Sequence, residues 1–208
     1  MKKLDGKELS EFITERQAHQ VRALRQSEHI APKLAIIQTI DDPVINMYVR
    51  LKQAYGADIP IDVIVYKIKQ VDIMSTITAL NEDDSIHGII IQLPLADPAQ
   101  TDEAVDAVLP AKDVDGLGKN ATLTPATAMA IDWLMAGYNI EMRGRTIAIV
   151  GNGRLVGEPL AALWLAAGYD VTVYDDTTDD LAGELKKAQI IVTATGVPGL
   201  ITSQMVQP

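Results

Sequence analysis

The order of secondary-structure patterns along the chain constrains its fold more than any other feature of the sequence. Aliphatic segments typical of strands lie at residues 33–40, 61–68 and 86–93. Helical patterns lie around them at residues 7–27, 42–56, 72–83 and 99–109. Because each strand segment is apolar at successive positions, we expect both of its faces to be buried. Strands that alternate with helices in this way predict an α/β fold with a parallel sheet covered by helices on both sides.

A second series of the same kind follows the polar, glycine-containing segment "PAKDVDGLGKNATLTPAT", residues 110–127. After a helical pattern at 126–138, it has strand patterns at 146–150, 170–174 and 189–195, with helical patterns at 155–167 and 179–187 between them. This order is that of half a Rossmann fold. We therefore predict two α/β domains, residues 1–120 and residues 121–208, of which the second is a Rossmann-like dinucleotide-binding domain.

Composition narrows the class of protein. With 208 residues of which 48% are hydrophobic, the chain is long and apolar enough for packed cores. Its 18 basic and 28 acidic residues make nucleic acid and anionic membranes poor partners. There is no cysteine, the histidines do not cluster, and the N-terminus lacks the apolar core of a signal peptide. We expect a cytoplasmic protein with neither disulfides nor a metal site.

The segment "TIAIVGNGRLVGEP" has the features of a nucleotide-binding turn. Gly151, Gly153 and Gly157 follow one expected strand and precede a helix. Glycines there let the backbone turn tightly and approach a pyrophosphate, which the helix N-terminus stabilises. For the glycines alone, an ordinary strand-to-helix turn is the alternative. The context favours a nucleotide, because Asp175 and Asp176 follow the next strand, where a dinucleotide fold carries the acid that binds the ribose hydroxyls.

The same aspartates bear on the choice of coenzyme. A carboxylate near the adenine ribose would repel a 2'-phosphate, so Asp175 and Asp176 favour NAD. Arg154 could pair with that phosphate and favour NADP instead. The sequence leaves both coenzymes open.

Several polar residues of the first domain are candidates for a site. Asp42, Pro43 and Gly56 predict a helix with clear ends. Within it, Tyr48 and Lys52 are four residues apart and share one face, although a snorkelling lysine beside a half-buried tyrosine is the commoner arrangement.

Gln92 ends the strand segment "GIIIQLPL" at its carboxyl end, where ligands gather in open α/β sheets. Asp113 and Asp115 lie in the loop after the next helix, where turn and capping roles are the alternatives.

Five segments taken together resemble one family of folate enzymes. In order, they are "YVRLK", "LNEDDSIHGIIIQLPL", "PAKDVDGLG", "VGNGRLVGEP" and "ATGVPGLI". Their order and approximate spacing are similar to those of the bifunctional methylenetetrahydrofolate dehydrogenase/cyclohydrolases, from about residue 7 to the last residue. The resemblance implies oxidation of methylenetetrahydrofolate to methenyltetrahydrofolate with NAD or NADP, followed by hydrolysis to formyltetrahydrofolate.

The resemblance also implies roles for individual residues. Tyr48 would stack on the aminobenzoyl ring of the folate, and Lys52 would be the acid/base residue. Gln92 would orient Lys52, and Asp115 would bind the pterin ring. The coenzyme would be held by Gly151, Asn152, Gly153, Arg154, Gly157, Asp175 and Asp176. NADP is the family's usual coenzyme, so the two aspartates depart from its pattern.

Two other interpretations stay open. One is an NAD-linked methylenetetrahydrofolate dehydrogenase with little cyclohydrolase activity. The other is a non-catalytic module that binds a nucleotide or a partner. The resemblance further implies a homodimer. It also implies a second domain truncated at its C-terminus, since a further strand, a loop and a long helix follow in the family.

Overall fold

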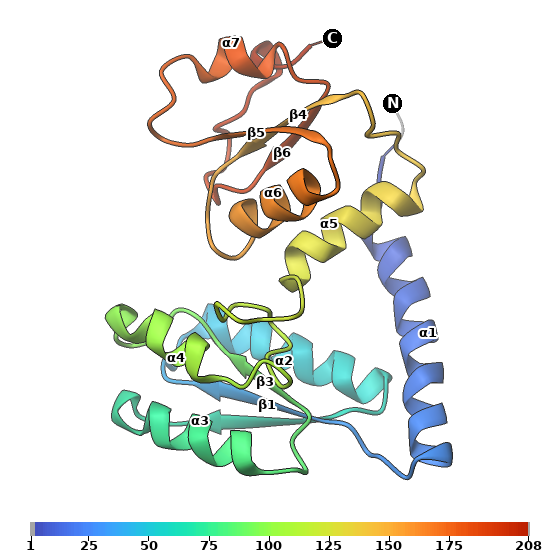
Figure 1. Ribbon diagram of the computed structural model, residues 1–208, viewed down its shortest axis with the longest axis vertical. Helices are drawn as coiled ribbons and strands as arrows, with labels where there is room; N and C mark the ends of the chain where they lie inside the picture. Colours follow the sequence, from blue (N-terminus) through green and yellow to red (C-terminus); the bar gives the residue numbers. More distant parts are fainter. Residues whose placement is uncertain (1–2, 208) are drawn as a thin grey trace. The chain divides into compact units, whose positions relative to one another are not determined.

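The computed structural model describes residues 3–207, which form two compact units, residues 3–123 and 124–207. Each unit has a three-stranded parallel sheet with helices packed against it (Figure 1). The predicted fold class, α/β with parallel sheets, is confirmed.

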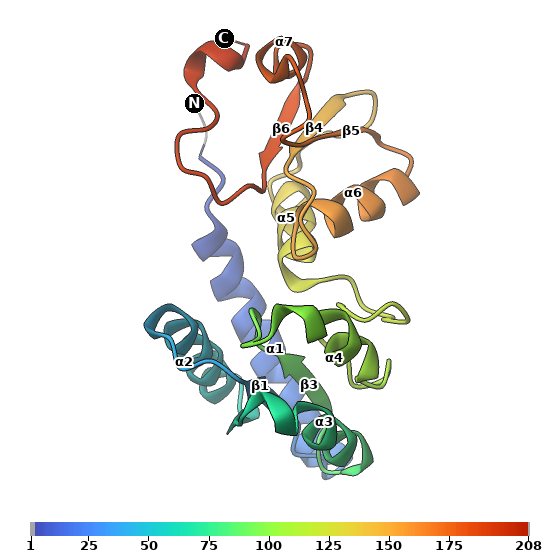
Figure 2. The ribbon, with the colours of Figure 1, turned by 90° about the vertical axis from the view of Figure 1, so that its left-hand side faces the viewer.

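The first unit contains the sheet order β2-β1-β3. Its strands are β1 (Lys33–Gln38), β2 (Asp62–Lys67) and β3 (Gly88–Ile91). Its α-helices are α1 (Gly6–Ser27), α2 (Pro43–Asp58), α3 (Ile73–Glu82) and α4 (Thr101–Ala107), with 3-10 turns η1 (Gln70–Asp72) and η2 (Pro98–Gln100). Figure 2 shows α2 on one side of this sheet and α3 and α4 on the other.

The helices of the first unit cover the two faces of its sheet with separate apolar clusters. Ile45 and Val49 of α2 pack on Ile36 and Ile90. Residues of α3 and α4 pack on the opposite face, around Ile37. Successive side chains of a strand point to opposite faces, so the central strand β1 contributes to both clusters.

Three of the four edge strands in the two sheets are less buried than expected. In β2, Asp62, Ile64 and Lys67 are exposed. In two strands of the second unit, β5 (Asp170–Tyr174) and β6 (Ile190–Thr193), every residue is exposed or half-buried. The expectation that every strand is buried on both faces is therefore wrong for β2, β5 and β6. Each of these strands has a neighbouring strand on one side only, which leaves part of it accessible. The edge strand β3 is the exception and is fully buried, because the loop after α4 pairs with it through Ile89 and Asp113.

Helix α2 begins where the sequence predicts but ends later than predicted. Asp42 Oδ1 accepts hydrogen bonds from the backbone N–H groups of Val44 and Ile45, and Pro43 is the first helical residue, as predicted. The prediction that Gly56 ends the helix is wrong, because α2 continues to Asp58. A Cβ at Gly56 would lie 2.3 Å from Cγ2 of Val63, so glycine at this position permits close packing of α2 on β2.

The second unit contains the sheet order β5-β4-β6. Its elements are α5 (Ala126–Gly137), β4 (Thr146–Val150), α6 (Gly157–Ala166), β5 (Asp170–Tyr174), α7 (Leu181–Leu185), β6 (Ile190–Thr193) and the 3-10 turn η3 (Ser203–Met205). Leu185 of α7 packs on Ala148 and Val150 of β4. On α6, Trp164 is fully buried, and its indole N–H donates to Asp132 of α5 at 2.9 Å.

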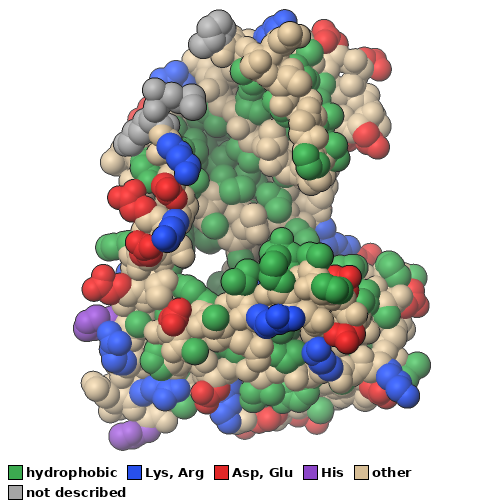
Figure 3. All heavy atoms as spheres, turned by 180° about the vertical axis from the view of Figure 1, so that it is seen from behind, with side chains coloured by type: hydrophobic (Ala, Val, Ile, Leu, Met, Phe, Trp, Pro, Cys, Tyr) green, Lys and Arg blue, Asp and Glu red, His purple; other side chains and the backbone are tan. Residues whose placement is uncertain are grey.

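Charged groups of both signs are interspersed on the face of the molecule drawn in Figure 3. Among residues 3–207, no helix combines the length and the apolar character needed to cross a bilayer.

Candidate functional site

The amine of Lys52 and the amide of Gln92 meet at the carboxyl end of the first sheet. Lys52 Nζ donates to Gln92 Oε1 at 2.8 Å. Gln92 follows β3, is 9% exposed, and continues the strand ladder by donating its backbone N–H to the carbonyl of Ile37. Its Nε2 donates to the carbonyl of Leu93 at 3.0 Å. A carbonyl accepts only from the NH₂ end of the amide, so this bond leaves Oε1 to face Lys52.

A carboxylate completes the group around Lys52. Burial lowers the pKa of Lys52, and the negative charge of Asp115 partly offsets that effect. Burial likewise raises the pKa of Asp115; Lys52 opposes the rise, and Asp113 adds to it. The structure thus brings Lys52, Gln92 and Asp115 together from α2, the end of β3 and the loop after α4.

Tyr48 lies one helical turn before Lys52 and presents its ring to solvent, with 52% of the residue exposed. Val44, Met47 and Leu51 are also about half exposed and recur at helical spacing with Tyr48. Together these four residues form an apolar stripe on the outer face of α2. Its flat tyrosine ring is a suitable surface for an aromatic ligand.

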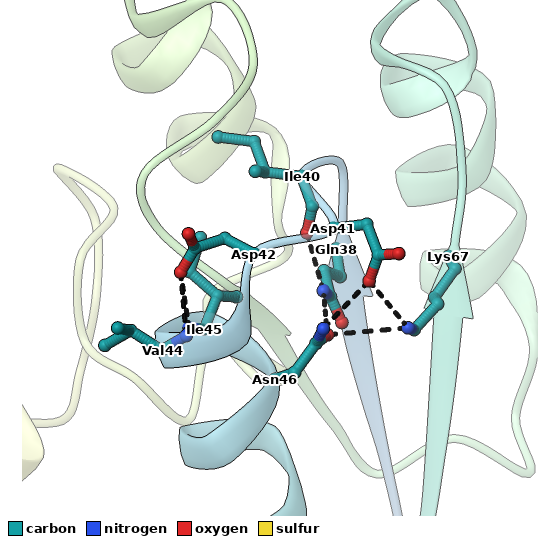
Figure 4. A network of polar contacts seen from close by, with 8 residues as sticks. All are labelled: Gln38, Ile40, Asp41, Asp42, Val44, Ile45, Asn46 and Lys67. Carbon is teal, nitrogen blue, oxygen red and sulfur yellow. Dashed lines mark hydrogen bonds and ion pairs between the residues drawn. The ribbon is translucent and has the colours of Figure 1, made fainter.

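The first turn of α2 is tied to the ends of β1 and β2 by polar side chains (Figure 4). Asn46 Nδ2 donates to Asp41 Oδ1 at 2.8 Å, and Gln38 Nε2 donates to Asn46 Oδ1 at 2.8 Å. Lys67 donates to the same two oxygens at 3.2 and 3.4 Å. Gln38 is 2% exposed, and its Oε1 has no hydrogen-bond partner among residues 3–207.

Sequence reasoning did not identify this network. One signal was available, because Gln38 resembles Gln92 as an amide at the end of an aliphatic strand. The network positions the helix that carries Tyr48 and Lys52.

In the second unit, the glycine turn has the close backbone packing expected of it. Gly151 has φ +101°, and a Cβ there would lie 2.7 Å from the carbonyl oxygen of Ala194. A Cβ at Gly157 would overlap the carbonyl oxygen of Gly151. Gly153 differs, because a Cβ on it would meet nothing within 4 Å. The turn therefore has open space at Gly153, where a ligand could approach the backbone, while Gly151 and Gly157 keep strand and helix close.

The turn and the two aspartates lie at the same end of the second sheet. Val150 pairs with Tyr174, and the N–H of Gly151 donates to the carbonyl of Tyr174 at 2.7 Å. Asp175 and Asp176 follow Tyr174 directly and are exposed.

Asp175 Oδ1 accepts hydrogen bonds from Thr177 Oγ1 at 2.6 Å and from the Thr177 backbone at 3.0 Å. These bonds lower the pKa of Asp175, which keeps the carboxylate charged. Asn152 and Arg154 are exposed residues of the turn. The residues present thus fit a dinucleotide, with glycine backbone for the pyrophosphate and acids for the ribose.

Comparison with known proteins identifies the family. A family model described as the catalytic domain of tetrahydrofolate dehydrogenase/cyclohydrolase matches residues 4–115, and one described as the NAD(P)-binding domain of the same enzymes matches residues 125–208. The chain belongs to the tetrahydrofolate dehydrogenase/cyclohydrolase family. The resemblance inferred from the five segments is confirmed.

Individual members of the tetrahydrofolate dehydrogenase/cyclohydrolase family match nearly the whole chain. The bifunctional protein FolD of Chloroflexus aurantiacus is 38% identical over 218 residues, which cover 99% of this chain and 76% of the relative. The FolD structure from Campylobacter jejuni has a TM-score of 0.93 at 33% identity and covers 98% of this chain and 77% of that one.

The structure of the Trypanosoma brucei enzyme complexed with NADP and an inhibitor has a TM-score of 0.91 at 26% identity and covers 98% of this chain and 74% of that one.

Proposed function

We propose that this protein oxidises methylenetetrahydrofolate to methenyltetrahydrofolate with a nicotinamide coenzyme and then hydrolyses that product to formyltetrahydrofolate. Its family and its bifunctional relatives support both activities. The observation that carries the proposal for this chain is the hydrogen bond of a partly buried lysine, Lys52, to an amide held in one orientation, Gln92.

Lys52 is the proposed acid/base group of the hydrolysis. Water that attacks the methenyl carbon must lose a proton, and the ring nitrogen that leaves must gain one. A neutral lysine can accept the first proton, and the resulting ammonium can donate the second. A lysine with its ordinary pKa of 10.5 is almost entirely charged near pH 7, so the lowered pKa of Lys52 increases the fraction that can act as a base.

The neighbours of Lys52 have positioning and binding roles in this proposal. Gln92 Oε1 accepts one N–H of Lys52 and so directs the amine. Tyr48 stacks on the aminobenzoyl ring through its exposed face. Asp115 binds the pterin, since a carboxylate can accept two N–H bonds from adjacent donors of such a ring.

The second unit supplies the coenzyme site. When bound, the nicotinamide coenzyme accepts the hydride that leaves the methylene carbon. We assign its pyrophosphate to the turn from Gly151 to Gly157, including Asn152 and Arg154, where backbone is accessible at Gly153. We infer a preference for NAD, because the charged carboxylates of Asp175 and Asp176 follow β5, the position that faces the adenine ribose in this fold.

The experiment that tests the function follows reduced-nicotinamide absorbance with methylenetetrahydrofolate and either NAD or NADP, and separates methenyl from formyl product. The wild-type protein should form both products. Lys52→Met should lower the hydrolysis rate by ~10²-fold or more, because it removes the group that transfers protons.

The matched control is Arg50→Met, which removes a positive charge from an exposed position of the same helix and should hydrolyse normally. Normal hydrolysis by Lys52→Met would remove Lys52 from the proposed role. Accumulation of methenyl product by the wild type would indicate a dehydrogenase with little cyclohydrolase activity, and no reduction of either coenzyme would indicate a non-catalytic module.

A further inference from the structure

Lys112 links the loop after α4 to the carboxyl end of α3. Its ammonium donates to the carbonyls of Leu80, Asn81 and Asp83 at 2.9, 2.8 and 2.8 Å. All three N–H bonds of the amine thus have acceptors, in a place where the partial negative charge of the helix end favours a cation. The side chain of Lys112 therefore holds one end of the loop in place.

The backbone of the same residue joins the loop to β3. The N–H of Ile89 donates to the carbonyl of Lys112 at 2.8 Å, and Ile89 and Asp113 form an isolated parallel bridge. Val114 packs directly over Gly88, where a Cβ would lie 2.8 Å from Val114 Cγ1. Glycine at the start of β3 therefore lets the loop lie close to the strand that leads to Gln92.

Asp113 fixes the part of the loop that follows it in the sequence. It is 4% exposed, and its two carboxylate oxygens accept the backbone N–H groups of Gly116 and Gly118, each at 2.9 Å. Gly116 has φ +68°, a conformation that glycine adopts without strain. The buried carboxylate closes the backbone around Val114 and Asp115, so the position of Asp115 depends on Asp113.

We propose that Lys112 and Asp113 are positioning residues that hold Asp115 beside Lys52. The inference rests on the proposed function of Lys52. Neither residue needs to contact a ligand, because both act through Asp115.

If the loop shifts, the direction in which the pKa of Lys52 changes follows from the charged group near its amine. The charge that acts on Lys52 is the carboxylate of Asp115 from the loop, and Asp113 in turn acts on Asp115. Gln92, which follows β3, contacts the amine as an uncharged amide. Asp115 raises the pKa of Lys52 against the lowering by burial. If the loop shifts and Asp115 moves away, the pKa of Lys52 falls. Hydrolysis that needs the neutral amine then begins at lower pH.

The test compares the pH dependence of methenyltetrahydrofolate hydrolysis in the wild type, Lys112→Met, Asp113→Asn and Asp115→Asn. Each variant should move the ascending limb of the pH profile to lower pH. In Lys112→Met and Asp113→Asn, kcat/KM should also fall by about 10- to 100-fold, because Asp115 is misplaced. Lys112→Arg, which keeps a charged donor, should recover part of the loss. Lys119→Met in the same loop, whose side chain is exposed and pairs with Asp106, should behave as wild type.

A double-variant cycle separates positioning from simple loss of stability. In an Asp115→Asn background, Lys112→Met and Asp113→Asn should cause no further movement of the limb. The inference would be overturned if the ascending limb of the pH profile stayed in place in both single loop variants, or in Asp115→Asn itself. It would also be overturned if the loop substitutions moved the limb by the same amount in the Asp115→Asn background as in the wild type. If instead Lys52→Met hydrolyses normally, the proposed function fails, which is a separate result.

Discussion

At the scale of single residues, the proposed preference for NAD depends on the two aspartates that follow β5. Both Asp175 and Asp176 are exposed, but Asp175 accepts hydrogen bonds from Thr177 and so also shapes its turn. Asp176→Ser removes a negative charge with little effect on that turn. The ratio of kcat/KM with NADP to kcat/KM with NAD should rise by about tenfold, because a like charge near the 2'-phosphate is gone.

Steady-state kinetics with both coenzymes measure this ratio. Asp179→Ser removes an exposed charge three residues further along and is the matched control. An unchanged ratio in Asp176→Ser would show that this carboxylate does not face the ribose.

At the scale of elements, α2 is held by contacts at its beginning as well as by its apolar face. Asn46→Ala removes the residue that joins Gln38, Asp41 and Lys67, and leaves the buried amide of Gln38 with one acceptor, the carbonyl of Ile40. A buried polar group that loses its partner is destabilising, so the free energy of unfolding should fall by about 1–3 kcal/mol in urea titrations.

Gln53→Ala, at an exposed position of the same helix, should change the free energy of unfolding by less than ~0.5 kcal/mol. Equal stability of the two variants would mean that the network contributes nothing to holding α2.

At the scale of the whole molecule, each unit has its own apolar core, and both tryptophans, Trp133 and Trp164, belong to the second unit. Trp164 is fully buried there, so tryptophan fluorescence reports on the unfolding of the proposed coenzyme unit. A coenzyme that binds only the folded state, at 100 times its Kd, should raise the free energy of this transition by about 2.7 kcal/mol. An unmoved midpoint with both NAD and NADP, compared with inorganic phosphate at equal ionic strength, would contradict coenzyme binding.

The sequence by itself determined the α/β class, the start of α2 at Asp42 and Pro43, the glycine turn after β4 and, through five ordered segments, the family. These features depend on periodicity and backbone preferences over a few neighbouring residues, which a single sequence displays directly. The proximity of Lys52 and Gln92, 40 positions apart, was implied only by the family resemblance.

Only the tertiary structure decided how distant residues act together. Gly56 was expected to end a helix, but its role depends on Val63, a residue of another element. The amide orientation of Gln92, the network around Asn46 and the three carbonyls around Lys112 were equally outside sequence reasoning. The physical reason is that a hydrogen bond between residues far apart in sequence depends on the positions of both backbones, and local preferences specify neither position relative to the other.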